Sequence, residues 1–472
     1  MINSLQRNAQ RALLISLSLT NQWLYELVFF ALASIVTWYI AWHGTSPISA
    51  FLIGEIIIGL FIIDFLRMKI LMHVYQVMLV YFYFSLVVFH SFNNTSGEFY
   101  YSAYFVSFLH GLFFVVGYHL ITAKKVVRPV APNQSMLSLV YMLFGFFMGL
   151  YVLLNYNSSP DYSHQWLTYE ESQALPIYKI YISIIYNYFI KLVIYLTSHP
   201  IITATFSILG NLISYPTSGV KGPMVASFIC FFVVMQVYLY RISFKGFLVF
   251  GILAGGFGFF LIGSTAFRGD LSIQSLIYTL SNVEVLTNRW HYFVMESPES
   301  SHIRYIADIM RMIENGVTDF RYGFDHYRFF LYPFKDLISG WELSSYNLYP
   351  VLLAGRNVSA GLYLGLGGEL FWNFGWFFPL VSLGYGVSLR WVTNYAFSGN
   401  FFAFVVYLMM VHSLVWHLYR GETNAFIITI TGISSALIIL KLSLKVRQIR
   451  LISFYITKIV VKRTVKRSMD LE

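Results

Sequence analysis

Charged residues and cysteine are scarce in this sequence of 472 residues. Only 11% of the residues are charged and 57% are apolar, whereas a soluble domain has roughly 25% charged and about 45–50% apolar residues. The single cysteine, Cys230, lies inside an apolar run, which excludes a disulfide scaffold. Aromatic residues, in contrast, make up 19% of the chain. This composition excludes a water-soluble or disordered protein and indicates a chain that crosses a membrane many times.

Motifs that hold metals or nucleotides are missing as well. The 12 histidines never show a metal-ligand spacing with a carboxylate partner on a helix. Neither a Walker-type loop nor a GxSxG elbow occurs. We therefore expect no metal site, no cofactor and no ATP-driven chemistry.

The net charge of +10, from 31 basic and 21 acidic residues, is unevenly placed. Nine of the 31 basic residues lie between Lys441 and Arg467, after the last hydrophobic stretch. A short basic segment beside a membrane exit typically rests on anionic lipid headgroups and determines topology. We therefore expect 442–472 to be a basic cytoplasmic tail whose partner is membrane lipid and not nucleic acid.

Twelve apolar stretches are long enough for a transmembrane helix, which needs about 20 residues. The sequence therefore predicts an all-α polytopic membrane protein with about 12 transmembrane helices in one membrane domain, 1–472. Nine stretches lie within 22–266 and three within 361–441, at about 22–42, 48–66, 70–90, 101–122, 135–154, 179–197, 200–215, 223–240, 246–266, 361–388, 399–418 and 425–441.

The basic residues next to short connectors predict the orientation of these helices. The connectors around Ser46, Asn94 and Asp161 contain no Lys or Arg. Cytoplasmic connectors carry an excess of Lys and Arg, so we expect both termini in the cytoplasm. The connectors on the basic side contribute Arg67, Lys69, Lys124, Lys125, Arg128, Arg241, Lys245 and Arg390.

One long outer segment, 268–360, has no stretch able to span a membrane. It is too long for a mere connector. Apolar positions around 305–313 and 329–337 predict short amphipathic helices at the outer (periplasmic) interface. Long loops are exempt from the charge rule, so we expect most of its basic residues at the surface; they include Arg289, Arg304, Arg311, Arg321, Arg328 and Lys335.

The densest polar pattern lies at 350–376, which reads PVLLAGRNVSAGLYLGLGGELFWNFGW. Gly365, Glu369 and Asn373 are four residues apart, so they share one helical face. A carboxylate and an amide are costly in lipid and should face protein or a wet cavity. Two interpretations stay open: hydrogen bonds between neighbouring helices, or a functional site. The glycines that open this helix can also seat an anion at its N-terminus.

Three further polar clusters emerge on the same face as Arg356. Arg and Lys that converge at a membrane surface suit a phosphate or pyrophosphate, which Arg can hold with two hydrogen bonds. The clusters are SGVKGP with Lys221, FRGD with Arg268, and HLYRGETNAF with His417, Arg420 and Glu422.

At these residues the sequence resembles the Wzy-type polymerases of bacterial surface polysaccharides, a group that includes the enterobacterial common antigen polymerase. The local matches are SGVKGPMVASFICFF, AGRNVSAGLYLGLGGELFWNFGW and LYRGETNAF. Arg356 and Gly367 are separated by ten residues, as in the RX10G pattern of this group. The order of features, with many spans, a late outer loop and a basic tail, is similar along most of the chain.

The resemblance implies a GT-C-like glycosyltransferase of the bacterial inner membrane. Such an enzyme joins oligosaccharide units carried on undecaprenyl diphosphate, cutting the growing glycan from its lipid pyrophosphate and passing it to a sugar hydroxyl of the next unit. A chain-length regulator is a further implied partner. The product is O-antigen, a component of lipopolysaccharide, or a related surface polysaccharide.

Roles for single residues follow from the same resemblance. Guanidinium groups stabilise a departing pyrophosphate without a metal, and Arg356 and Arg420 are the first choices for this role. Lys221 and Arg268 are the next. The incoming hydroxyl needs a base or an acceptor, for which Glu422 is the first candidate. Glu369 and His417 are held in reserve, with Asn373 as a supporting polar group. Aromatic residues of the loop, Trp290, Tyr327, Trp341 and Tyr346, are expected to bind glycan.

Two other functions remain open. An O-antigen ligase of the same superfamily shares the membrane fold and the outer arginines. A lipid-linked oligosaccharide flippase also has about a dozen spans, and Glu55, Asp64 and Lys191 are ionisable groups that a carrier can use. Transporters, however, are commonly built from two related halves, and this chain shows no such repeat.

Overall fold

The computed structural model describes about half of the chain. Its main described segments are 47–70, 72–83, 98–124, 126–130, 199–218, 221–239, 302–331, 364–421 and 426–439. Shorter described pieces lie at 35, 188, 191–192, 194–196, 281–282, 284, 348–349, 351–352, 423 and 441. Within the helices, the side chains at 47, 49, 50, 211–218, 221–224, 329, 412, 416, 419 and 420 lie outside the description.

The described segments are helical, and their one β contact is an isolated bridge between Val127 and Ser398. The all-α fold class is therefore confirmed for this part of the chain. The helices are α2 (Pro47–Met68), α3 (Val74–Tyr83), α5 (Glu98–Leu120), α9 (Pro200–Ser218), α10 (Lys221–Tyr238), α14 (His302–Glu314), α15 (Phe324–Leu331), α17 (Gly365–Phe374), α18 (Phe378–Ala396) and α19 (Phe401–Arg420), with a short 3₁₀ turn, η5 (Gly375–Phe377), and a last helix at 426–439.

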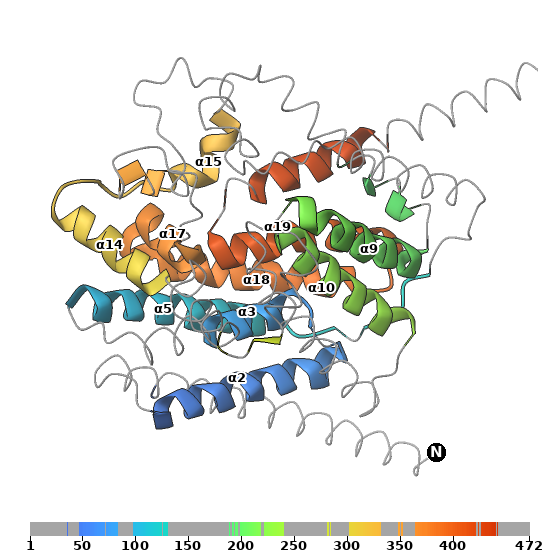
Figure 1. Cartoon of the computed structure of the whole chain (residues 1–472), viewed down its shortest axis with the longest axis horizontal. Coiled ribbons are helices and arrows are strands. Elements are labelled where there is room, and N and C mark those ends of the chain that lie inside the picture. The colour runs from blue at the N-terminus through green and yellow to red at the C-terminus, as the bar shows by residue number, and fades with distance from the viewer. Residues whose placement is uncertain are drawn as a thin grey trace, which may run out of the picture.

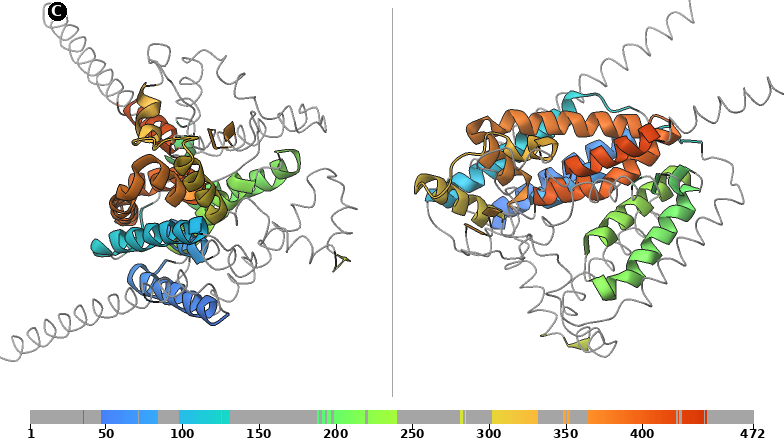
Figure 2. Two further views of the ribbon diagram at one scale, coloured as in Figure 1. Left: turned by 90° about the vertical axis from the view of Figure 1, so that its left-hand side faces the viewer. Right: turned by 90° about the horizontal axis from the view of Figure 1, so that it is seen from above.

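Long helices lie side by side at the centre of the molecule (Figure 1), and α5 and α18 form its closest pair. A methyl group at Gly117 would collide with the carbonyl of Leu383, and one at Gly386 with that of Phe114. Small residues allow this close approach of two backbones. The hydrogen bonds between His110 and Ser382, and from Asn394 to the carbonyl of Thr122 just after α5, show that α5 and α18 run in the same direction. Figures 1 and 2 show α9 and α10 as a neighbouring pair.

One stretch predicted as a single span, 361–388, is broken in the structure, and that prediction is wrong. α17 ends at Phe374, η5 follows, and α18 begins at Phe378. Gly375 has φ of 54°, a left-handed conformation that glycine adopts readily, and Pro379 stands in the first turn of α18. The sequence is apolar on both sides of this break, so hydrophobicity alone predicts one continuous helix.

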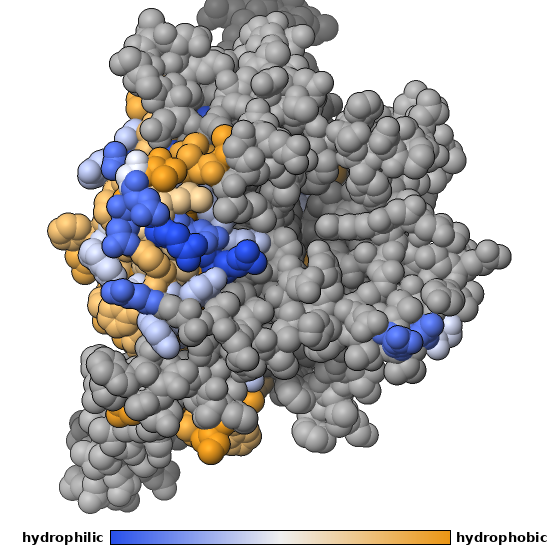
Figure 3. Space-filling view, turned by 60° about the vertical axis from the view of Figure 1, so that its left-hand side comes forward, coloured by the Kyte–Doolittle hydropathy of each residue, from blue (hydrophilic) through white to orange (hydrophobic). Residues whose placement is uncertain are grey.

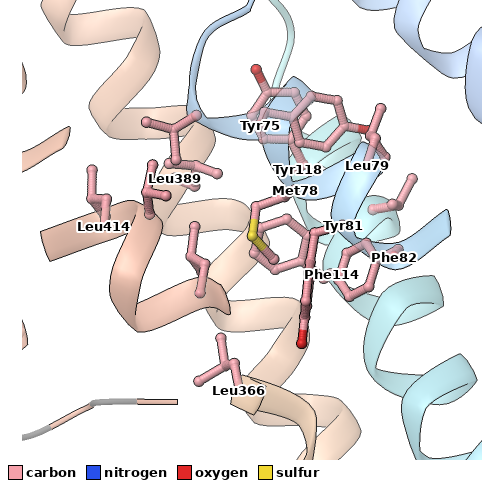
Figure 4. Packing of buried hydrophobic residues seen from close by; sticks show 14 of the residues in the cluster. Tyr75, Met78, Leu79, Tyr81, Phe82, Phe114, Tyr118, Leu366, Leu389 and Leu414 are labelled. Carbon is pink, nitrogen blue, oxygen red and sulfur yellow. The ribbon is translucent and has the colours of Figure 1, made fainter. Parts of the chain in front are cut away.

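Aromatic side chains fill the core between α3, α5 and α18 (Figure 4). The rings of Tyr75 and Tyr118 stack face to face, with 3.6 Å between their centroids and an angle of 2°. Phe82 packs edge-on against Phe114 at 5.9 Å. These buried rings pack α3 against α5.

Asp64 in α2 is the centre of a buried polar cluster. Its carboxylate lies 2.6 Å from Nε2 of His73 and 3.2 Å from Nη1 of Arg390. It also accepts hydrogen bonds from Nε2 of Gln76 at 3.1 Å and from the hydroxyl of Tyr118 at 3.2 Å. The side chains of Asp64, His73 and Arg390 are 0% exposed. The cluster therefore joins α2, the turn before α3, α5 and α18 through one negative charge.

Arg390 is held on several sides. Its guanidinium lies over the ring of Tyr118, 4.5 Å from the centroid, and its Nε donates to the carbonyl of Ile121. Removing one member of a buried ion pair leaves the other charge without compensation. The position of Arg390 consequently depends on the charge of Asp64.

The exposed residues of α18 form one stripe without a charge. Trp376 and Phe377 are exposed at its beginning, and Trp391 and Tyr395 toward its end. Between them Leu380, Gly384 and Ser388 continue the stripe at helical spacing. Among the described helices, α5 has the length and apolar character needed to cross a membrane, and several shorter helices are apolar as well.

The Asp64 cluster gives a first prediction. We expect Asp64→Asn to lower the free energy of unfolding by about 3–5 kcal/mol, because it leaves Arg390 buried without its counter-charge. The double variant Asp64→Asn/Arg390→Met should recover a large part of this loss. Thermal unfolding of the purified protein in detergent measures both.

A surface ion pair provides the matched control. Arg311 lies 3.6 Å from Asp308, and its side chain is 50% exposed. Arg311→Met should change stability by less than about 1 kcal/mol. A double variant no more stable than Asp64→Asn alone would contradict the dependence of Arg390 on Asp64.

Candidate functional site

The beginning of α17 packs against the end of α19, and this contact joins two of the polar segments singled out in the sequence. A methyl group at Gly421 would lie 2.7 Å from the carbonyl oxygen of Gly365 and 2.8 Å from Oε2 of Glu369. Gly421 has φ of 78° and ends α19 by donating its N–H to the carbonyl of His417. Only a residue without a side chain fits this left-handed, crowded position.

Glu369 is 1% exposed, and its carboxylate faces the turn that follows α19. Both carboxylate oxygens lie 3.4 Å from the backbone N–H of Thr423, which donates to them. A buried carboxylate needs such donors because its charge is costly away from water. Glu369 thus holds the described part of the turn after α19, at Gly421 and Thr423.

The glycines at the start of α17 allow close packing on three neighbours. A methyl group at Gly365 would lie 2.9 Å from the hydroxyl of Tyr81, and one at Gly367 would lie 3.1 Å from the ring of His110. At Gly368 it would meet Ile306 of α14 at 2.8 Å. Side chains therefore cover this helix terminus, which favours packing over anion binding for the glycines.

The far end of α17 is capped by the loop between α14 and α15. The N–H groups of Arg321 and Gly323 donate to the carbonyls of Trp372 and Asn373, at 3.0 and 2.8 Å. The indole of Trp372 donates to the carbonyl of Asp319 at 3.0 Å. The last carbonyls of a helix have no partner within it, so this loop supplies the missing donors.

Asn373 and Asp325 join α17 to α15 by side-chain hydrogen bonds. Nδ2 of Asn373 donates to Oδ2 of Asp325 at 2.7 Å, and Oδ1 of Asn373 accepts from the N–H of Asp325 at 3.2 Å. Nε of Arg321 donates to the same Oδ2 at 3.2 Å. The guanidinium of Arg321 also lies over the ring of Trp372. Asp325 is 1% and Asn373 0% exposed, so loop and helix are held together away from water.

The residue after Asp325 reaches α18. Nε2 of His326 lies 3.1 Å from the hydroxyl of Tyr385, and the His326 ring packs edge-on against Phe374. Burial lowers the pKa of His326 below its ordinary value, and the charge of Asp325 offsets part of this effect. Tyr385 in turn lies beside the ring of His417, with 5.1 Å between centroids.

The predicted site residues have different outcomes. Glu369, Asn373 and His417 lie in one polar region where α17, α18 and α19 meet. Lys221 begins α10 and Arg420 ends α19, with side chains outside the description. Arg268, Arg356 and Glu422 lie wholly outside the described residues.

Sequence reasoning missed Arg321, Asp325, His326 and Tyr385. Arg321 and Arg328 were expected at the surface, but they are 6% and 4% exposed, while Arg304 and Arg311 are exposed as expected. The sequence did contain a signal for the ion pair of Arg321 and Asp325, because these two residues are four apart. No feature of the sequence distinguished Tyr385 from the other aromatic residues of its apolar stretch.

Polar and apolar residues share the end of the molecule that carries α14 (Figure 3). The apolar face of α14, with Ile303, Ile306 and Met310, is buried, while Arg304 and Glu314 are exposed. The predicted amphipathic helix at 305–313 is confirmed. The second, at 329–337, overlaps the end of α15, and its remainder lies outside the described residues.

Comparisons with known proteins add no relative: no protein-family model, no curated protein and no solved structure matches this chain.

The contact between Asn373 and Asp325 gives a second prediction. Asn373→Asp places two carboxylates where a donor now meets an acceptor, and like charges in contact repel. We expect the 319–331 segment to become sensitive to protease at neutral pH and less so in acid, where one carboxylate is protonated. Limited proteolysis followed by mass spectrometry measures this.

Asn315→Asp is the matched control, since Asn315 is exposed at the end of α14. It should leave the cleavage pattern unchanged. Equal protection of 319–331 in Asn373→Asp and in the unaltered protein at neutral pH would refute the role given to this contact.

Proposed function

We propose that the protein is a polymerase of undecaprenyl-diphosphate-linked oligosaccharide units, of the Wzy type and with a GT-C-like membrane fold. It transfers the growing glycan from its lipid pyrophosphate to a sugar hydroxyl of the next unit, without a metal. The observation that carries the proposal is the contact between α17 and the turn after α19. That contact unites two segments on which the resemblance rests.

The helix directions support the proposed place in the inner membrane. The basic connectors predict that the stretches matching α5 and α18 run from the outside inward, and the two helices run parallel to each other. The exposed aromatic residues of α18 stand about 27 Å apart, from Phe377 to Tyr395. A hydrocarbon core is about 30 Å thick, with Trp and Tyr enriched at both of its interfaces.

The cations do the central chemistry in this proposal. Arg356 and Arg420, with Lys221 and Arg268, hold the pyrophosphate as the glycan leaves it. The bond between the anomeric carbon and the pyrophosphate breaks, and the departing oxygen gains charge that fixed guanidinium groups stabilise. Because Glu369 holds the turn after α19, we expect it to keep the neighbouring Arg420 and Glu422 in place.

Tyr327 supports a glycan-binding role for the loop. Its side chain is 43% exposed on α15, next to the histidine that contacts α18. Exposed aromatic rings can bind the apolar faces of sugars. Trp290, Trp341 and Tyr346, the other predicted glycan contacts, lie outside the described residues.

The structure weakens the support for a carrier. Asp64, one ionisable group on which a flippase can rely, is bound by donors from His73, Gln76, Tyr118 and Arg390 and is 0% exposed. A carboxylate that binds a transported ion needs free acceptor positions. Asp64 instead stabilises the fold.

A gel of surface glycolipid tests the proposed function. In a strain that lacks this gene, the long-chain ladder should collapse to core plus one repeat unit. Arg356→Ala and Arg420→Ala should fail to restore the ladder because they lose cations that stabilise the leaving pyrophosphate. The loss expected for such a group is at least about 100-fold in rate.

Arg304→Ala is the matched control, since Arg304 belongs to the same loop but is exposed on α14. It should restore the full ladder. If no repeat unit reaches the core in the deletion strain, the protein is a ligase or flippase instead. An unchanged ladder in every strain would rule out a role in this polymer.

A further inference from the structure

His326 differs from the other titratable groups at the candidate site. Its ring is half-buried, while Glu369 and His417 are each 1% exposed. Glu369 accepts the N–H of Thr423, and His417 stacks on Phe426 with 4.6 Å between centroids. Asp325 is held by Arg321 and Asn373. Among these described groups, His326 is the one whose ring is partly exposed.

The two ring nitrogens of His326 have unequal environments. Nε2 lies 3.1 Å from the hydroxyl of Tyr385. Nδ1 is shielded from water and has no hydrogen-bond partner among the described residues. A buried polar atom without a partner destabilises the folded protein, and such atoms in native proteins call for a functional or ligand-based explanation. A bound hydroxyl would give Nδ1 the partner it lacks.

We propose that His326 is the catalytic base that takes the proton from the acceptor hydroxyl, an inference that rests on the polymerase function proposed above. The hydroxyl oxygen forms a bond to the anomeric carbon of the growing glycan. The bond from that carbon to the pyrophosphate breaks, and its electron pair leaves with the pyrophosphate. The hydroxyl proton moves to Nδ1 of His326, and the imidazolium later returns it to water.

Tyr385 is the positioning residue in this proposal. When Nε2–H of His326 donates to the Tyr385 hydroxyl, the lone pair of the neutral ring is at Nδ1, which can then act as the base. Tyr385 also contacts the site on its other side, where Thr423 and Glu369 lie beside it. It therefore links the proton acceptor on α15 to the turn that carries Arg420.

The surroundings of His326 keep it neutral at neutral pH, as a base must be. Burial lowers its pKa. The groups that face it are Asp325 on its own helix, whose charge offsets part of that shift, Tyr385 from α18 and the apolar ring of Phe374 from α17. Arg321 is bound to Asp325 and reduces the influence of its charge. The rate should fall on the acid side as His326 becomes protonated.

An assay with the purified full-length protein tests the inference. The substrate is the lipid-linked repeat unit extracted from the deletion strain, and polymer formation is measured between about pH 5 and pH 8. We expect His326→Gln to lower kcat by about 10²–10⁴-fold, with KM changed less than about threefold and the acid limb of the pH profile lost. Tyr385→Phe removes an acceptor that favours the charged ring, so its acid limb should move to lower pH.

Two controls keep the result specific. His199→Gln, at the start of α9, and Tyr395→Phe, at the exposed end of α18, should retain the wild-type rate and profile. Thermal unfolding in detergent verifies that each variant is folded. If the unaltered protein makes no polymer, the proposed function itself fails. If it polymerises while His326→Gln keeps its rate, or Tyr385→Phe keeps an unmoved acid limb, His326 is not the base.

Discussion

The candidate site depends on a helix that ends inside the protein. α17 stops at Phe374, and its last carbonyls would lack partners if no other segment supplied donors. The backbone N–H groups of Arg321 and Gly323 supply them, and the side-chain hydrogen bond from Asn373 to Asp325 holds the same segment against the helix. The same hydrogen bonds that satisfy the helix therefore bring α15, with His326, to α18. One set of contacts therefore both caps α17 and positions His326 next to α18.

Two of the buried carboxylates among the described residues, Asp64 and Glu369, have different roles in the fold. Asp64 is surrounded by four donors from three other elements, one of them a guanidinium, and joins helices with a charge that is fully compensated. Glu369 faces a backbone N–H at the longer distance of 3.4 Å. The contacts of Asp64 join helices, whereas the contact of Glu369 with Thr423 joins α17 to the turn after α19. Their positions within apolar stretches look alike in the sequence.

Composition and hydrophobic runs predicted the helices well and their interruptions poorly. The stretches at 48–66, 101–122 and 399–418 match α2, α5 and α19 within a few residues, because long apolar runs have few alternatives to a helix. The break at Gly375 escaped prediction because all its neighbours are apolar. Four-residue spacing correctly placed Glu369 and Asn373 on one face. Partners from distant segments, such as Asp325 for Asn373, follow from tertiary packing that no local pattern encodes.

In the proposed function, the helix ends contribute cations and the long outer segment contributes a base, which suits a reaction between two lipid-linked molecules. In the proposed reaction the donor leaves a charged pyrophosphate close to the membrane, where cations at helix ends such as Arg420 can hold it. The acceptor presents only a hydroxyl, which needs a neutral base and no fixed charge. His326 meets that need because it lies on the loop, shielded and hydrogen-bonded to Tyr385 on the bundle side. The proposal therefore places the pyrophosphate-binding cations and the base on separate elements. The hydrogen bonds that cap α17 keep these elements close to one another.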